Sequence, residues 1–101
     1  MSVRFLIDTG STKTWLSDLV ISQLRLPLVG TAQASVPNGL QRVDVYAADL
    51  LFAQLGLSIP GIEIRSFKQR SLSREGLLGR DVTDRLVLRI DGPRNELLLQ
   101  F

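Results

Sequence analysis

The 101-residue sequence contains neither cysteine nor histidine. The absence of cysteine excludes disulfides and thiolate metal sites. The absence of histidine excludes Ser-His-Asp and Cys-His catalysis, and most zinc and copper sites. Any catalysis must therefore use carboxylates, lysine, tyrosine or hydroxyl groups, and we expect no metal and no other cofactor.

Strong net charge and long apolar runs are also missing. The sequence has twelve Lys and Arg residues and ten Asp and Glu residues, which gives a net charge of +2. That value is mild for a protein that binds nucleic acid. No apolar run approaches the ~20 residues that span a bilayer, and no secretory signal is visible at the N-terminus. We therefore expect a cytoplasmic protein with no nucleic-acid or membrane partner.

The densest basic region contains Arg65, Lys68, Arg70 and Arg74. Such a run is typical of a solvated surface loop. A phosphate-binding patch is the alternative, although Phe67 is the only aromatic residue among these charges.

Frequent Gly and Pro residues separate short apolar segments, which indicates a mainly β domain covering residues 1–101. A helix is expected over residues 17–24 and a shorter one over 81–85. Pro37-Asn38-Gly39 predicts a hairpin turn, and Pro60-Gly61 predicts a second one. The expected strands are residues 3–7, 33–36, 40–52, 57–59, 62–64, 76–79, 86–90 and 96–101.

The most informative stretch is Asp8-Thr9-Gly10-Ser11, which follows an apolar strand and occurs once. A carboxylate at the end of a buried strand is costly unless it is paired or functional. A plain turn after a strand is the structural alternative. Acid–base chemistry by two carboxylates needs a second one, and another copy of the chain is its natural source.

Two other acids have simpler explanations. Asp91 lies in an Asp-Gly-Pro turn, where aspartate is common. Asp81 follows Gly79-Arg80 and fits the first turn of a helix, where an acid complements the helix dipole.

Several segments together resemble the retropepsin-like, or retroviral-type, aspartic proteases, in particular their small bacterial members. They are residues 5–11, the Pro37-Asn38-Gly39 hairpin, Leu77-Leu78-Gly79-Arg80-Asp81, and a last strand that begins at Glu96 and ends at Phe101. The resemblance implies a closed, barrel-like acid protease fold with one or two short helices. It also implies that one chain is half of a homodimer.

The resemblance further implies a catalytic mechanism. Asp8 from each of two chains would lie side by side and share one proton, one carboxylate acting as base on a water and the other as acid. Thr9 would brace the two loops across the dimer, and Gly10 would let backbone approach the carboxylates. Ser11 would donate a hydrogen bond to the outer oxygen of Asp8 and shift activity toward acidic pH.

The same resemblance assigns residues to substrate binding. Trp15 and Leu77 would line side-chain pockets, with plain core packing as the alternative for each. The segment from Ser35 to Arg42, with Pro37, Asn38 and Gly39 at its turn, would close as a flap over an extended peptide. The partner is therefore a peptide or protein substrate.

The chain departs from the family pattern in two places. Only seven residues precede Asp8, so the family's first strand and hairpin are absent or unrecognisable in this sequence. Either the chain is a fragment, or its dimer depends on the strand from Glu96 to Phe101, the Asp8 loops and other surfaces. We therefore expect the chain to dimerise weakly or in an altered way. In addition, the family's arginine at the position of Arg80 pairs with an acid where this chain has Thr12 and Lys13, so either Asp18 or Asp81 takes that place or the bond is lost.

Three functions are consistent with these observations. A homodimeric aspartic endopeptidase is favoured, because Asp8, Thr9 and Gly10 are all present. A non-catalytic, protease-like module that dimerises or binds peptides is the first alternative. A basic interaction domain built on residues 65–74 is the second.

Overall fold

The computed structural model describes residues 2–68 and 75–100. Over these residues the chain is mainly β, as predicted. The elements in chain order are β1 (Phe5–Ile7), β2 (Thr14–Ser17), α1 (Asp18–Leu24), β3 (Leu28–Val36), β4 (Gly39–Phe52), the 3-10 helix η1 (Ala53–Leu55), β5 (Leu57–Phe67), β6 (Gly76–Leu78), α2 (Arg80–Thr83), β7 (Val87–Asp91) and β8 (Glu96–Gln100). None of the helices in the described part of the chain is long and apolar enough to cross a membrane.

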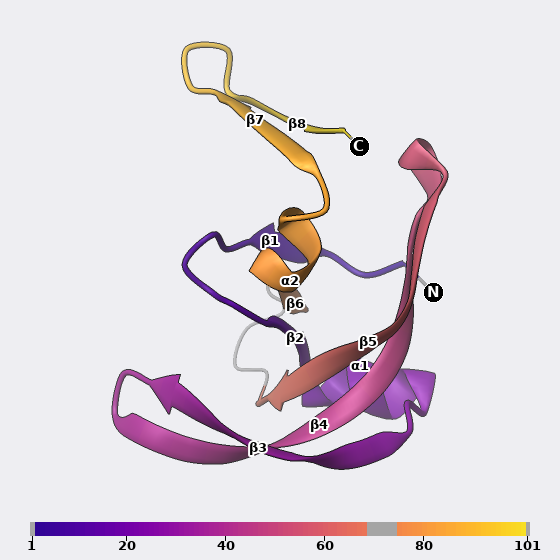
Figure 1. Cartoon of the computed structure of the whole chain (residues 1–101), viewed down its shortest axis with the longest axis vertical. Coiled ribbons are helices and arrows are strands. Elements are labelled where there is room, and N and C mark those ends of the chain that lie inside the picture. Colours follow the sequence, from indigo (N-terminus) through magenta and orange to yellow (C-terminus); the bar gives the residue numbers. More distant parts are fainter. Residues whose placement is uncertain (1, 69–74, 101) are drawn as a thin grey trace.

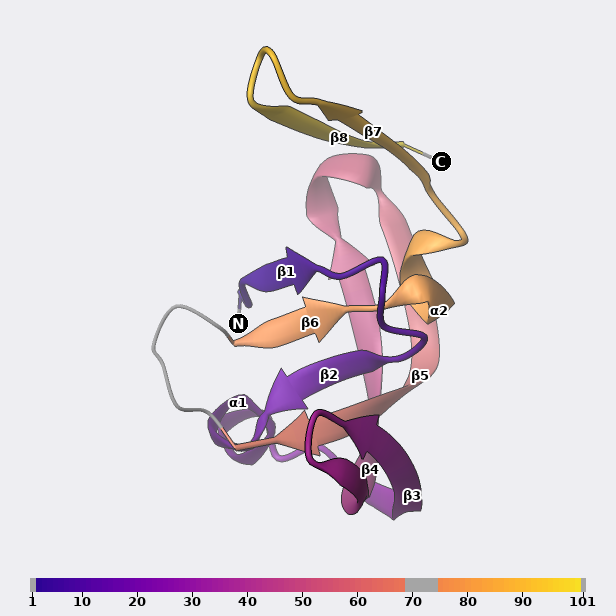
Figure 2. The same cartoon turned by 90° about the vertical axis from the view of Figure 1, so that its left-hand side faces the viewer.

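The strands form one large curled sheet and one separate hairpin (Figure 1). The large sheet has the order β1-β6-β2-β5-β4-β3, and β7 pairs with β8 alone. Two pairs, β1 with β6 and β2 with β5, are parallel. Figures 1 and 2 both place the β7–β8 hairpin at one end of the molecule, beyond the large sheet. The barrel-like curl agrees with the predicted fold class.

The core lies between one face of this sheet and α1. Its buried members are Leu16, Val20, Ile21, Ile59, Ile62, Ile64, Leu78 and Val82. Helix α1 begins after Ser17, whose Oγ accepts the Val20 N–H at 3.1 Å and so caps the first turn. It ends where Arg25 adopts a left-handed conformation, with φ of 52°. The predicted helix over residues 17–24 is therefore confirmed to within one residue.

The hairpin predicted at Pro60-Gly61 is wrong, because β5 runs continuously through these residues. Ala48 pairs with Ile62 and Leu50 with Ile59, so Pro60 and Gly61 together oppose one residue of β4. This is a β-bulge, in which a glycine of positive φ is as favourable as in a turn. Gly61 has φ of 64° and donates its N–H to the Asp49 carboxylate at 2.8 Å. The chain reverses instead at η1.

The other hairpins follow the sequence closely. β3 and β4 pair up to Val36 and Gly39, which confirms the turn at residues 37–39. The last two strands pair over residues 87–91 and 96–100, also close to expectation. Strand β2 was not predicted, since its four residues lie between a loop and a helix and show no pattern of their own.

The basic region at residues 65–74 is only partly described. Arg65 belongs to β5 and is half-buried. The predicted surface loop is therefore wrong for this residue. Lys68 is exposed at the end of that strand. Arg70 and Arg74 lie outside the described residues.

Candidate active site

The loop between β1 and β2 (residues 8–13, the Asp8 loop) and Gly79, which joins β6 to α2, begin at the same end of the sheet. β1 and β6 are parallel, with Ile7 opposite Leu78, so the residues that follow each strand are neighbours (Figure 2). The Asp8 N–H donates to the Leu78 carbonyl at 3.0 Å. Two segments that are distant in the sequence are thereby brought to one place.

The Asp8 carboxylate is held by its own turn. The Gly10 N–H donates to Asp8 Oδ1 at 3.0 Å, and the Ser11 N–H donates to the Asp8 carbonyl at 3.1 Å. Asp8 is half-buried, while Thr9 and Gly10 are exposed. A Cβ at Gly10 would lie 3.3 Å from Asp8 Oδ1, a tight contact. Asp8 Oδ2 accepts no hydrogen bond from residues 2–68 or 75–100, so one oxygen is open to an outside group.

The Ser11 hydroxyl does not donate to Asp8, and that prediction is wrong. It donates to the Lys13 carbonyl at 2.7 Å. A hydroxyl carries a single proton, and the loop turns so that a backbone acceptor two residues ahead receives it. Ser11 therefore braces the Asp8 loop from within.

A buried threonine connects the two loops. Thr14 is fully buried; its Oγ1 donates to Asp81 Oδ1 at 2.7 Å and accepts the Gly79 N–H at 3.1 Å. The Thr14 N–H donates to Asp81 Oδ2 at 3.2 Å. Asp81 does lie in the first turn of α2, as predicted, but its carboxylate is bound by Thr14, a residue that no motif of the sequence marks. Nothing in the sequence signals this pairing across 67 positions.

Backbone hydrogen bonds add to this connection. The Arg80 N–H donates to the Ser11 carbonyl at 2.8 Å, and the Asp81 N–H donates to the Thr12 carbonyl at 3.2 Å. The start of α2 is thus fastened to Ser11 and Thr12, in the second half of the Asp8 loop. A side chain at Gly79 would break this contact, because its Cβ would lie 2.1 Å from the Lys13 carbonyl oxygen.

Arg80 pairs with neither of the acids expected from the sequence. Its Nε lies 3.1 Å from Asp84 Oδ1, one helical turn along the chain. Both side chains are more than half exposed. Asp81, one of the expected partners, is held by Thr14 instead.

Trp15 and Leu77 lie directly opposite each other on β2 and β6. Both are half-buried, and as cross-strand partners they share one face of the sheet. Leu6 is the partner of Leu77 on β1, which places it on the same face two residues before Asp8. The structure therefore brings together two residues that the sequence assigned to substrate pockets.

The predicted flap residues Pro37, Asn38 and Gly39 are all exposed, at the tip of the β3–β4 hairpin. Figure 1 shows this tip and the β1–β2 loop on the same side of the molecule. In the single chain the tip forms no described hydrogen bond to Asp8.

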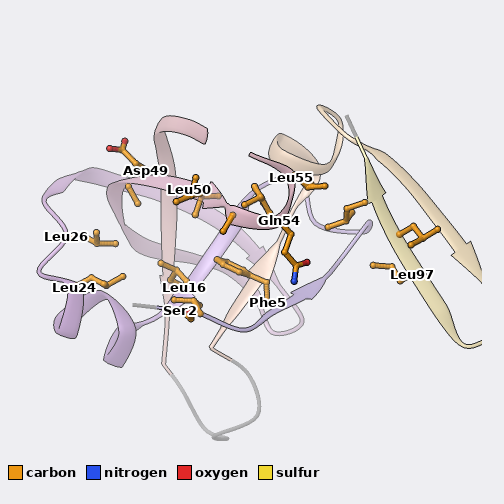
Figure 3. Close-up of a pocket in the computed structure, with 17 residues that line it drawn as sticks. Ser2, Phe5, Leu16, Leu24, Leu26, Asp49, Leu50, Gln54, Leu55 and Leu97 are labelled. Atoms are coloured by element: carbon orange, nitrogen blue, oxygen red, sulfur yellow. The ribbon is translucent and has the colours of Figure 1, made fainter. Parts of the chain in front are cut away.

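A large apolar groove lies elsewhere. It has a volume of about 860 Å³ and lies between residues 48–55, where β4 ends and η1 turns the chain, and residues 97–99 of β8. Figure 3 shows Phe5, Leu16 and Leu50 from the sheet, and Leu97 from β8. Asp8 and Trp15 do not line it. Within the described ranges no three His, Cys, Asp or Glu side chains are grouped to hold a metal ion.

Comparisons with known proteins agree with this geometry. The family model described as aspartyl protease matches residues 2–82. A crystal structure of a retropepsin-like aspartic protease from Rickettsia conorii superposes with a TM-score of 0.67 at 18% identity, covering 98% of this chain and 73% of that one. The retroviral protease-like domain of Ddi1 from Leishmania major gives 0.57 at 16% identity, covering 96% and 78%. A search of curated proteins finds no match.

Proposed function

Because the chain belongs to the aspartyl protease family, we propose that it is an aspartic endopeptidase. Its working site would combine two copies of Asp8, one from each chain of a homodimer. The observation that carries this proposal is the state of Asp8 itself. The carboxylate is half-buried at the end of β1, with Oδ1 engaged by Gly10 and Oδ2 open.

Two such carboxylates at contact distance share one proton, since both cannot ionise cheaply. The ionised one takes a proton from a water, whose oxygen attacks the peptide carbonyl carbon. The protonated one donates to the carbonyl oxygen. The tetrahedral species then breaks at its C–N bond: the carboxyl that took the water proton gives it to the leaving nitrogen, and the other carboxylate takes back the proton it gave to the carbonyl oxygen, which restores the shared-proton pair. The titration belongs to the pair and not to either Asp8.

The rigid support of Asp8 fits this role. Reacting groups gain most when they are held in place before substrate arrives. The Thr14–Asp81 contact and the bond from Arg80 N–H to the Ser11 carbonyl fasten the loop to α2. Thr9 and Gly10 stay exposed at the loop tip, which leaves them free to meet the second loop.

Substrate would bind as an extended peptide across Trp15 and Leu77. The exposed hairpin tip at residues 37–39 would close over it, with its backbone paired to the peptide as an added strand. The half-buried state of Trp15 and Leu77 supports this use, since each keeps part of its side chain accessible.

The homodimer would use the last strand in addition to the Asp8 loops. Leu97 and Leu98 of β8 are 46% and 44% exposed in the single chain. Exposed apolar residues on an unpaired strand edge favour association with another chain. Phe101, at the end of the proposed interface, lies outside the described residues.

Cleavage of a peptide library at acidic pH tests the proposal, with wild type compared with Asp8→Asn. Asparagine keeps the shape of the side chain and cannot act as the acid or the base. Asp44→Asn, which removes the same charge from an exposed site on β4, is the matched control. We expect cleavage by wild type and the control, and none by Asp8→Asn.

Two results would contradict the proposal. Cleavage that survives Asp8→Asn excludes the dyad. Absence of cleavage at every pH, with peptide binding or dimerisation retained, favours the non-catalytic module.

Activity per chain should also fall steeply on dilution, because each site needs two chains.

A further inference from the structure

A row of cross-strand partners crosses the sheet from the active-site edge and includes an arginine, Arg65. Leu77 of β6 lies opposite Trp15 of β2, and Trp15 lies opposite Arg65 of β5. Arg65 in turn lies opposite Val45 of β4. Partners directly across a sheet point to the same face. Arg65 therefore shares the face of Trp15 and Leu77, and the buried core residues Leu16 and Ile64 take the other face.

One N–H of the Arg65 guanidinium lacks an acceptor among the described residues. Its Nε is buried and has no hydrogen-bond partner among the residues that the structure describes. The ion pairs in those residues join Arg80 to Asp84 and Arg94 to Asp91, so neither uses Arg65. Arginine stays charged at any physiological pH. A buried N–H of a charged group that stays unpaired is costly, and such groups normally have a partner.

Within residues 2–68 and 75–100, Glu63 of β5 and Asp49 of β4 do not supply this acceptor. Glu63 is nearest in the sequence on the same face of β5, two residues before Arg65, but it is exposed and forms no ion pair with it. The side chain of Asp49 is engaged by Gly61. An acceptor from outside the chain would complete the site.

We propose that Arg65 is a specificity-determining residue, which binds the carboxylate of an Asp or Glu side chain in the peptide substrate. This inference rests on the proposed endopeptidase function. The planar guanidinium can bind a carboxylate through two parallel hydrogen bonds. The adjacent Trp15 and Leu77 offer apolar contacts, so the preferred substrate combines apolar residues with one acid.

The position of the acid follows from the sheet geometry. Three strand spacings separate β5 from β1, which is about 14 Å on a flat sheet and less on a curled one. An extended peptide advances about 3.3 Å per residue. The acidic residue should therefore lie two to four residues from the bond that is cleaved.

Matched peptides test this assignment. A neutral, apolar peptide that the enzyme cleaves is made in pairs that carry Glu or Gln at one position, moved from two to four residues on either side of the cleaved bond. At one position we expect kcat/KM for Glu to exceed that for Gln about tenfold, the effect of one charge-assisted hydrogen bond. Arg65→Gln should bring the ratio close to one, while Arg65→Lys should keep part of it. Arg25→Gln, which removes an exposed charge at the end of α1, should leave the ratio unchanged.

Binding separates this inference from the proposed function. If no peptide is cleaved, the endopeptidase proposal fails, and the same Glu and Gln pairs are then titrated against the full wild-type chain. Tighter binding of a Glu peptide, lost in Arg65→Gln, supports the arginine site without catalysis. Equal behaviour of Glu and Gln at every position overturns it, as does a Glu preference that survives Arg65→Gln. If Arg65→Gln does not fold, the wild-type ratio and the Arg65→Lys variant decide.

Discussion

Replacing Thr14 with valine removes one hydroxyl from the contact between the Asp8 loop and α2. Thr14 is fully buried, so the substitution exposes no new surface. Its hydroxyl both donates to Asp81, at 2.7 Å, and accepts from the Gly79 N–H, at 3.1 Å. Valine has nearly the same shape and can do neither.

The expected loss has two parts. A hydrogen bond to a carboxylate contributes about 1.5–3 kcal/mol, and a buried N–H left without an acceptor costs about 1–3 kcal/mol. We therefore expect Thr14→Val to lower the free energy of unfolding by about 3 kcal/mol, out of the roughly 5–15 kcal/mol typical of a domain. Thr14→Ser keeps both hydrogen bonds and loses one methyl group, which should cost about 1 kcal/mol.

Urea unfolding followed by the fluorescence of Trp15, the only tryptophan, measures both variants. With a slope of about 1.5 kcal/mol per molar urea, the midpoint should fall by about 2 M for Thr14→Val and by less than about 1 M for Thr14→Ser. A valine variant as stable as the serine variant would refute the reasoning. The double variant with Asp81→Asn adds a check, because the two losses should not be additive if the pair interacts.

Three further predictions concern the same scaffold. Gly79→Ala should destabilise by about 3 kcal/mol or more, since its Cβ would lie 2.1 Å from a backbone oxygen, whereas Gly30→Ala, with open space around it, should change the urea midpoint little. Ser11→Ala should cost about 1 kcal/mol in the same assay and leave the pH–rate profile unchanged, because the hydroxyl donates to a carbonyl and not to Asp8; a shifted profile would contradict this assignment. Arg80→Ala should lower the free energy of unfolding by less than about 1 kcal/mol, and this loss should shrink in high salt, since the ion pair with Asp84 is exposed. A large loss that is equal in low-salt and high-salt urea unfolding would be inconsistent with that.

Local chemistry made much of the fold predictable. Asn38-Gly39 specified the β3–β4 turn, and Ser17 marked the start of α1. Pro60-Gly61 predicts a hairpin turn where the structure has a bulge, because both features favour the same residue types. What separates them is whether the partner strand continues, and here β4 continues past Asp49.

The side-chain partners in the site were less predictable. Ser11 and Arg80 each had several acceptors within reach in the sequence, and the turn geometry chose Lys13 and Asp84. The orphaned Nε of Arg65 was invisible for the same reason, since the charge pattern of residues 65–74 resembles a surface loop.

The sequence by itself determined the mainly β class, the helix that begins after Ser17, and the family to which the Asp8 motif points. These features depend on contacts between near neighbours or on short motifs, which a linear pattern records. The tertiary structure alone decided the pairing of Thr14 with Asp81 and the alignment of Leu77, Trp15 and Arg65. Those contacts depend on the register of strands far apart in the chain, and a shift of one residue would turn each side chain to the opposite face.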